Sequence, residues 1–297
     1  MVVLLTSDTK IWSREEAQEH CRRLALTHYE NFTVGSLLIP RKLRQHIYNL
    51  YGYARTVDDL GDEAPGSRLQ LLDNWERDLD RCYQGQPAHP VMVALQETIN
   101  TFDIPKEPFW KLIQANRADQ KTSRYQTYQD LLHYCDHSAN PCGRLVLYVF
   151  GYRDEARQKL SDFTCTALQL TNFWQDVTRD YGMGRIYLPL EDLRRFGVTE
   201  EQIAQGQADE KFRRLMEFEV ERTKELFGRG LGLVEQVGGI AKVDIALFNR
   251  GGLAVLEAIE KQDYDVLSRR PRLSRFRKGW LFASTYLRMR LGGHVTV

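Results

Sequence analysis

The chain has 297 residues, of which 41 are Lys or Arg and 40 are Asp or Glu, so its formal net charge is only +1 at pH 7. This balance argues against nucleic acid as a partner, because proteins that bind a phosphate backbone carry a basic excess. No run of about 20 apolar residues is present to span a bilayer, and the first residues lack the basic start and apolar stretch of a secretory signal. We therefore expect a cytoplasmic globular protein.

The cysteines are odd in number and scattered, and none has the spacing of a zinc site or a CxxC pair. Such usage favours free thiols in a reducing compartment over disulfides. The five are Cys21, Cys82, Cys135, Cys142 and Cys165.

Helical periodicity dominates the chain. Apolar residues recur three and four apart over residues 43–57 and again over residues 160–177. Pro and Gly separate such stretches, and Pro141 interrupts residues 131–152, where it either kinks a helix or marks a boundary between two. We expect roughly ten helices with short connections. With no alternating strand–helix pattern and no linker, the sequence predicts an all-α protein with a single domain over residues 1–297.

The first helical stretch ends in an acidic cluster, residues 58–62 (Asp-Asp-Leu-Gly-Asp). Asp58 and Asp62 are four residues apart and share a helix face, and Arg55 lies one turn earlier. Arg55 is the only charged residue between His46 and Val57, which is unusual for a helix that faces solvent.

The second stretch carries Gln169, Asn172, Asp176 and Asp180, which are three, four and four residues apart and share one stripe. Both acidic stripes could be ordinary solvated helix faces. Two features favour a site instead. Like charges four apart repel each other by roughly 0.2–0.5 kcal/mol, and no charged residue lies between Phe163 and Gln175.

Only oxygen ligands are offered by these stripes, which selects a hard cation. Magnesium typically binds one or two carboxylates and takes its other ligands from water and substrate phosphates. Two such faces opposed across a cavity would hold a diphosphate between metal ions, and the metal would act as a Lewis acid on a leaving diphosphate.

These motifs resemble those of squalene and phytoene synthases. Residues 58–62 resemble the first aspartate motif of that family, and residues 172–189, with Asn172, Asp176, Asp180 and the run Gly-Arg-Ile-Tyr-Leu-Pro, resemble the second. The resemblance runs from about His28 to about Lys278. It implies the isoprenoid synthase α-fold, with helices around a central substrate cavity, and a magnesium-dependent enzyme that takes a farnesyl-derived diphosphate.

Within the family the chain resembles most the bacterial hydroxysqualene synthase branch, from the hopanoid route to squalene. Residues 28–32 (His-Tyr-Glu-Asn-Phe) replace a serine-containing segment that binds a second diphosphate. Residues 138–143 (Ser-Ala-Asn-Pro-Cys-Gly) replace a Val-Ala-Gly segment, and residues 250–253 (Arg-Gly-Gly-Leu) stand where a tyrosine is common. Residues 263–266 (Asp-Tyr-Asp-Val) also fit the branch. This resemblance implies that presqualene diphosphate is ionised and captured by water to give hydroxysqualene.

The resemblance also implies roles for individual residues. The expected magnesium ligands are Asp58, Asp62, Asn172, Asp176 and Asp180. Further residues expected in catalysis or along the substrate are Arg55, Tyr187, Tyr29, Asn31, Tyr51, Gln169, Arg185, Asn140 and Arg269. Asp119 stands near a carboxylate of the family, and Tyr134 and His137 lie near the replaced segment at 138–143.

Two alternatives stay open. The chain could be a complete squalene, dehydrosqualene or phytoene synthase that joins two prenyl diphosphates head to head. It could also be a catalytically silent relative that serves in assembly or binds a lipid diphosphate. The oligomeric state is open, and so is contact with the inner face of the membrane, which the apolar substrate and the basic residues at 269–278 favour.

Overall fold

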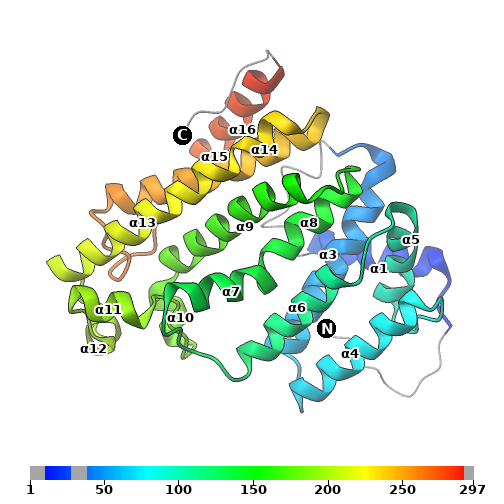
Figure 1. Cartoon of the computed structure of the whole chain (residues 1–297), viewed down its shortest axis with the longest axis horizontal. Coiled ribbons are helices and arrows are strands. Elements are labelled where there is room, and N and C mark those ends of the chain that lie inside the picture. The colour runs from blue at the N-terminus through cyan, green and yellow to red at the C-terminus, as the bar shows by residue number, and fades with distance from the viewer. Residues whose placement is uncertain (1–10, 28–38, 291–297) are drawn as a thin grey trace. The chain divides into compact units, whose positions relative to one another are not determined.

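We describe a computed structural model of the chain, which covers residues 11–27 and 39–290. These residues form helices and no strand, apart from one isolated bridge between Arg124 and Ile186, so the predicted all-α class is confirmed (Figure 1). The helices outnumber the roughly ten expected because several are short. They are α1 (Arg14–Thr27), α3 (Arg41–Asp62), α4 (Arg68–Tyr83), α5 (Pro90–Phe102), α6 (Glu107–Asp119), α7 (Tyr128–Ser138), α8 (Asn140–Val149), α9 (Glu155–Gln175), α10 (Val177–Gly182), α11 (Leu190–Phe196), α12 (Glu200–Ala204), α13 (Glu210–Gly230), α14 (Gly232–Gln236), α15 (Gly239–Lys261) and α16 (Arg275–Arg290).

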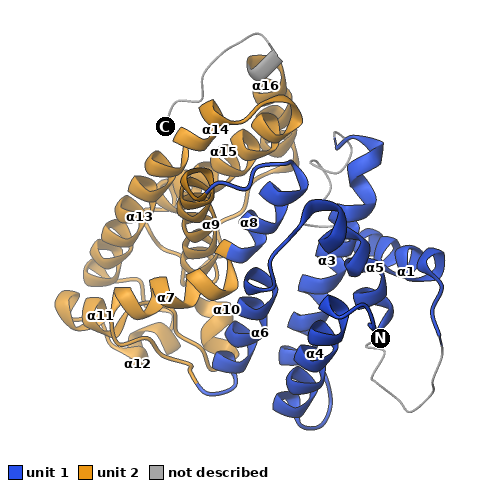
Figure 2. Ribbon diagram, turned by 45° about the vertical axis from the view of Figure 1, so that its right-hand side comes forward, with its two compact units in different colours: residues 1–121, 141–154 blue, residues 122–140, 155–297 orange. Residues whose placement is uncertain are grey.

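The chain divides into two compact units, coloured separately in Figure 2. Unit 1 comprises residues 1–121 and 141–154, and unit 2 comprises residues 122–140 and 155–297. The boundary near Pro141 coincides with a break in the helix, since α7 ends at Ser138 and α8 begins at Asn140. Of the two expectations for Pro141, the helix boundary is the one observed, and the proline occupies the first turn of a new helix, where its missing N–H costs nothing.

Unit 1 is built around α3, whose apolar side packs against α1, α4, α5 and α6. Tyr53 of α3 is fully buried; its ring meets that of Phe109 edge to face at 4.9 Å between centroids, and its hydroxyl donates to the Phe109 carbonyl at 2.9 Å. Buried Asn49 donates to the Ala94 carbonyl at 2.9 Å, which ties α3 to α5. These contacts satisfy the buried polar groups and fix the rotation of α3 about its axis.

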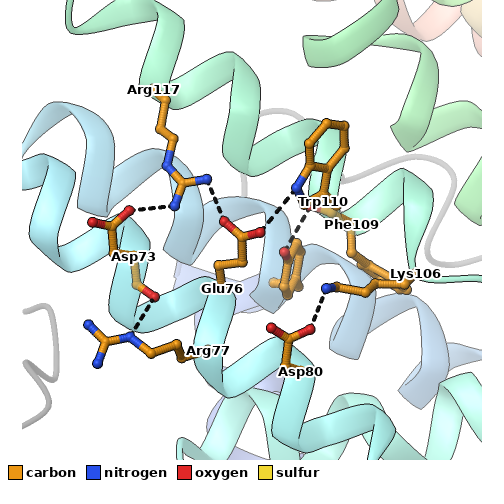
Figure 3. Close-up of polar contacts among 9 residues, drawn as sticks. Asp73, Glu76, Arg77, Asp80, Lys106, Phe109, Trp110 and Arg117 are labelled. Atoms are coloured by element: carbon orange, nitrogen blue, oxygen red, sulfur yellow. Dashed lines mark hydrogen bonds and ion pairs between the residues drawn. The ribbon is translucent and has the colours of Figure 1, made fainter.

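A row of polar contacts holds α6 on α4 (Figure 3). Arg117 pairs with Asp73 at 2.5 Å and also with Glu76, and the indole N–H of Trp110 donates to Glu76 at 3.1 Å. Lys106 pairs with Asp80 at the other end of the row. Contacts spread over three turns fix the axial position of α6, which matters for the first acidic motif.

Unit 2 is organised by α13, which packs on both α9 and α15. Gly252 allows the close approach of α15, because a Cβ there would lie 2.2 Å from the Phe227 ring. The indole N–H of buried Trp174 donates to Thr223 at 2.8 Å, which joins α9 to α13. Trp174 is part of the core of unit 2.

All five cysteines are free thiols; Cys21, Cys82 and Cys135 are buried, Cys165 is partly buried and Cys142 is exposed. In the ranges 11–27 and 39–290, no helix is both long enough and apolar enough to cross a bilayer.

Candidate active site

The first acidic motif occupies the last turn of α3. Asp58 and Asp62 both lie on the exposed side of this helix end, on the shared face that the spacing predicts. Asp58 is accessible to solvent but crowded by protein atoms, and this partial desolvation raises its pKa to about 6. Repulsion from Asp62 acts in the same direction.

Arg55 is engaged along its own helix. Its Nη2 lies 2.5 Å from an oxygen of Asp59 and 3.1 Å from Oε1 of Glu63. Tyr51, one turn earlier, is partly buried, and this burial raises the pKa of its phenol. Arg55 therefore reaches the acidic end of α3, where Asp59 and Glu63 are its ion-pair partners.

The Asp58 carboxylate is supported from α6. Nδ2 of buried Asn116 donates to Asp58 at 3.2 Å and to the Leu112 carbonyl at 3.1 Å. Gln120 donates to the Gly61 carbonyl at 2.8 Å, and Gly61 leaves room for Asn116, since a Cβ at this position would lie 2.1 Å from its Oδ1. The glycine within the acidic motif thus permits the amide that orients the first aspartate.

Asn116 and Gln120 were not among the residues expected in the site. Their only sequence signal is a pair of amides four residues apart at the end of α6. Asp119, which was expected near the site, lies between them and is partly buried.

The second acidic motif spans the junction of α9 and α10. The helix is interrupted at Asp176, whose backbone φ of −110° and ψ of 15° are not helical. The backbone bonds from Asp176 to Asn172 and from Asp180 to Asp176 persist at 2.9 and 2.8 Å, so the predicted spacing is preserved. Asn172 is exposed, Gln169 and Asp176 are partly buried, and Asp180 is buried.

Burial raises the pKa of Asp180 to about 7, and repulsion from Asp176 adds to this shift. The positive charges of Arg179, Arg185 and Arg270 oppose it. Two carboxylates one turn apart, one of them buried, create a local excess of negative charge that a bound cation would relieve.

Arg270 neutralises part of this charge. Its guanidinium pairs with both carboxylate oxygens of Asp176, with Nη2 at 3.0 Å from Oδ2, and also donates to Oε1 of Gln175 at 3.3 Å. The neighbouring Pro271 carbonyl accepts a hydrogen bond from buried Gln175 at 2.5 Å, and Thr178 donates to the Leu267 carbonyl at 3.2 Å. The segment 267–271 is therefore fastened to the second motif.

Arg269, the arginine expected at the substrate, lies beside this contact. Its Nη2 is 3.5 Å from Oε1 of Gln262. In the sequence, Arg270 is one of several basic residues between 269 and 278. No sequence feature indicates that Arg270, and not a neighbouring arginine, pairs with Asp176.

The segment that follows the second motif is held by residues 123–126. Ile186 N–H donates to the Ser123 carbonyl at 2.9 Å, and Arg124 donates to the Gly184 carbonyl at 2.7 Å. Gly184 adopts φ of +80°, which lets the chain reverse direction just before Arg185. The Arg185 N–H then donates to the Asp180 carbonyl at 2.9 Å, so this turn places Arg185 next to the buried aspartate.

Tyr187 anchors the same segment. Its ring is buried and stacks on Phe173 with 3.7 Å between centroids and 7° between planes, and Tyr125 stacks on it at 5.7 Å. Tyr134 joins the cluster at 6.0 Å from Tyr187. Since Phe173 follows Asn172 directly, the cluster connects the Tyr187 segment to the second motif.

The remaining candidates are placed as follows. Buried Asn140 accepts a hydrogen bond from Thr166 of α9 at 2.9 Å. His137 faces the His133 carbonyl at 3.0 Å within α7. Tyr29 and Asn31 lie outside the described residues. Asp58 and Asp62 thus meet within unit 1, and Asn172, Asp176 and Asp180 meet within unit 2.

The donor set of both motifs fits magnesium. Each offers carboxylate oxygens on successive turns of a helix. Burial raises the pKa of Asp58 and of Asp180, and repulsion from Asp62 and Asp176 adds to the two shifts. Over residues 11–27 and 39–290, no three acidic, histidine or cysteine side chains gather into a complete site. Magnesium bound in this way keeps positions for water and phosphate oxygens.

Known proteins of similar sequence identify the family of this chain. The sequence profile described as squalene/phytoene synthase covers residues 26–277. A 15-cis-phytoene synthase from Synechocystis sp. is 34% identical over 275 residues, which are 87% of this chain and 81% of that protein. A phytoene synthase from Arthrospira platensis is 31% identical and covers 94% of this chain and 95% of its own length.

Solved structures of related enzymes have a similar fold. Squalene synthase HpnC from Alicyclobacillus acidocaldarius is 47% identical with a TM-score of 0.82, over 84% of this chain and 95% of that chain. A dehydrosqualene synthase solved with a ligand is 25% identical with a TM-score of 0.85, over 94% of this chain and 98% of that chain. The predicted fold and the predicted likeness to the branch that contains HpnC are confirmed. The chain belongs to the squalene/phytoene synthase family of isoprenoid-synthesising enzymes, with the all-α isoprenoid synthase fold.

Proposed function

We propose that this protein ionises presqualene diphosphate in a magnesium-dependent reaction and captures the resulting cation with water, giving hydroxysqualene and diphosphate. The observation that carries the proposal is the pair of intact acidic motifs in a chain that is 47% identical to squalene synthase HpnC. The altered segments at 28–32, 138–143 and 250–253 support a single diphosphate substrate, because the family resemblance implies that the groups they replace serve the second diphosphate or the cyclopropyl step.

Magnesium, held by Asp58, Asp62, Asn172, Asp176 and Asp180, would supply Lewis-acid stabilisation of the departing diphosphate. We propose that residues 1–297 form one catalytic domain. Arg55, Arg185 and one arginine of the pair Arg269 and Arg270 would donate charge-assisted hydrogen bonds to its oxygens. Their cationic side chains cannot lose a proton at neutral pH, which suits them to a leaving group with several negative charges.

The remaining candidates would serve the isoprenoid part. Tyr29, Asn31, Tyr51 and Gln169 would contact the substrate, and Tyr187 would hold the segment that carries Arg185. Asn140 is buried beside Thr166 and would orient the water. When the carbon–oxygen bond breaks, its electron pair leaves with the diphosphate; the rearranged cation gains the water oxygen and then loses one proton, so charge and atoms balance.

A head-to-head synthase is the second candidate. The phytoene synthases at 34% and 31% identity favour it, since both cover most of the chain. In that case the chain would join two prenyl diphosphates, and the altered segments would be tolerated changes. We also propose that the enzyme works at the inner face of the cytoplasmic membrane, where so apolar a product partitions.

The purified protein should be incubated with magnesium, without NADPH, on presqualene diphosphate and separately on farnesyl diphosphate, with products identified by mass spectrometry. Hydroxysqualene from the first substrate and no product from the second is the expected result. Presqualene diphosphate or a polyene formed from farnesyl diphosphate would overturn the proposal in favour of a head-to-head synthase. Failure to release diphosphate from either, or from geranylgeranyl diphosphate, would indicate a silent or binding relative.

A further inference from the structure

The outer face of α16 carries an exposed apolar stripe. Phe276, Trp280 and Leu287 are 93, 70 and 58% exposed. They are four and seven residues apart, close to one and two full turns of a helix, so they lie on one side. Exposed aromatic residues in such a row are unusual for a protein that has no partner on that side.

The opposite side of α16 is fixed to the protein. Thr285 follows Trp280 by five residues and so lies toward the far side of the helix, where it is fully buried and accepts a hydrogen bond from Arg250 of α15 at 2.5 Å. Figure 1 shows α16 running beside α15 at the C-terminal end of the chain. The apolar stripe is therefore held outward by contacts on its back, and it does not project from a free helix.

The sequence that contains the stripe is basic. After Asp265 the sequence has no acidic residue but eight basic ones, which are Arg269, Arg270, Arg272, Arg275, Arg277, Lys278, Arg288 and Arg290. Arg275 and Arg277 adjoin Phe276 in sequence and so lie about 100° to either side of the stripe. Arg277 pairs with Glu257, and Arg272, Arg275 and Lys278 are exposed and make no ion pair with any described residue.

We propose that α16 docks the enzyme in the plane of a lipid bilayer that carries anionic head groups. Phe276, Trp280 and Leu287 would enter the boundary between head groups and acyl chains, and the flanking arginines would meet lipid phosphates. A second copy of this chain is disfavoured, since a two-fold contact would press two such basic faces together. The inference deepens the membrane location proposed above and is independent of the reaction.

Vesicle co-sedimentation of the full-length protein tests this directly. Wild-type protein should sediment with vesicles of phosphatidylcholine and phosphatidylglycerol, bind pure phosphatidylcholine on the order of tenfold more weakly, and be released by high salt. The variant F276S/W280S/L287S should lose binding by on the order of tenfold or more. The matched control is Phe248→Ser, which removes an aromatic residue that is 52% exposed on α15 and should bind like wild type.

Circular dichroism and turnover of detergent-dispersed substrate should be the same for the triple variant and wild type. This control excludes unfolding as the cause of lost vesicle binding. If the triple variant is unstable, Trp280→Ser alone should still weaken binding severalfold. Wild-type protein that ignores anionic vesicles, or a triple variant that binds them equally well, would overturn the proposal. A dimer in sedimentation velocity that the triple variant dissociates, without vesicle binding by either protein, would assign the stripe to a second copy instead.

Discussion

Arg270 pairs with both carboxylate oxygens of Asp176, the central aspartate of the second acidic motif. This guanidinium supplies positive charge to a carboxylate that is expected to bind magnesium. The positive charge of Arg270 also opposes the burial that raises the pKa of Asp180 one turn away. Arg270 is thus the cation through which the 267–271 segment is coupled to the motif.

Replacing Arg270 by glutamine should lower turnover more than the same change at Arg269. The reason is that Arg270 touches the motif, whereas the guanidinium of Arg269 contacts Gln262 at 3.5 Å. Steady-state release of diphosphate by the two variants measures this, with about a tenfold or larger separation expected for loss of a charge-assisted hydrogen bond. The reverse ranking would assign the diphosphate contact to Arg269. The effect on unfolding free energy should stay below about 1 kcal/mol, because the pair is partly exposed.

Gly61→Ala should disturb the first motif through Asn116. The added methyl would lie 2.1 Å from the Asn116 oxygen, so the amide must move and Asp58 loses its donor. We expect a destabilisation of about 1–3 kcal/mol, as for other overpacked sites, together with lower turnover. Thermal unfolding and diphosphate release give the two quantities.

Gly228→Ala is the matched control, since this glycine is also helical and a Cβ there meets nothing within 4 Å. Its stability should be unchanged or raised by up to about 1 kcal/mol. The double variant G61A/N116A should recover part of the lost stability, because removing the amide frees the space. If the Gly61→Ala protein is as stable and active as wild type, the close approach of the Asn116 side chain to Gly61 is contradicted.

Tyr187→Phe should retain most of the turnover, whereas Tyr187→Ala should lose it. The stack on Phe173 at 3.7 Å depends on the ring and holds the segment that bears Arg185. Loss of a buried aromatic ring typically costs about 3–5 kcal/mol, so the alanine variant should also unfold at lower temperature. If the phenylalanine variant is as inactive as the alanine variant, the hydroxyl has a chemical role.

Glu219 makes the stability of the fold depend on pH. Burial raises the pKa of this fully buried side chain to about 8, against the attraction of Arg222, which it contacts at 2.5 Å. Between about pH 4.5 and 8 the folded protein therefore keeps a proton that the unfolded chain releases. The free energy of unfolding should fall as pH rises through this window.

Glu219→Gln keeps the shape of the protonated side chain and should remove that part of the pH dependence. Chemical denaturation of both proteins at a series of pH values measures the slope. Asp80→Asn, which alters a partly exposed ion pair with Lys106, is the control and should leave the slope unchanged. If the unfolding free energy depends on pH equally in wild type and Glu219→Gln, the raised pKa of Glu219 is contradicted.

Much of the fold and of the site follows from local sequence patterns. Helical periodicity predicted the all-α class, and the four-residue spacing predicted that Asp58 would share a face with Asp62, as Asp176 does with Asp180. Local spacing is enough for these features because a helix places residues four apart on one side.

Other features depend on contacts between distant residues and were not predictable. Asn116 is 58 positions from Asp58, and Arg270 is 94 positions from Asp176. The helix break at Asp176 leaves the spacing intact, so it has no sequence signal. Gly61 could have suggested a close approach, although a glycine in a helix does not identify its neighbour.

The origin of the product's oxygen tests the proposed water capture most directly. Presqualene diphosphate should be converted with magnesium in water labelled with the heavy oxygen isotope, and the hydroxysqualene should be analysed by mass spectrometry. Cleavage of the carbon–oxygen bond followed by water capture predicts one heavy oxygen atom in each product molecule. An alcohol that retains the light oxygen of the substrate would show cleavage at phosphorus, and it would contradict ionisation at the acidic motifs.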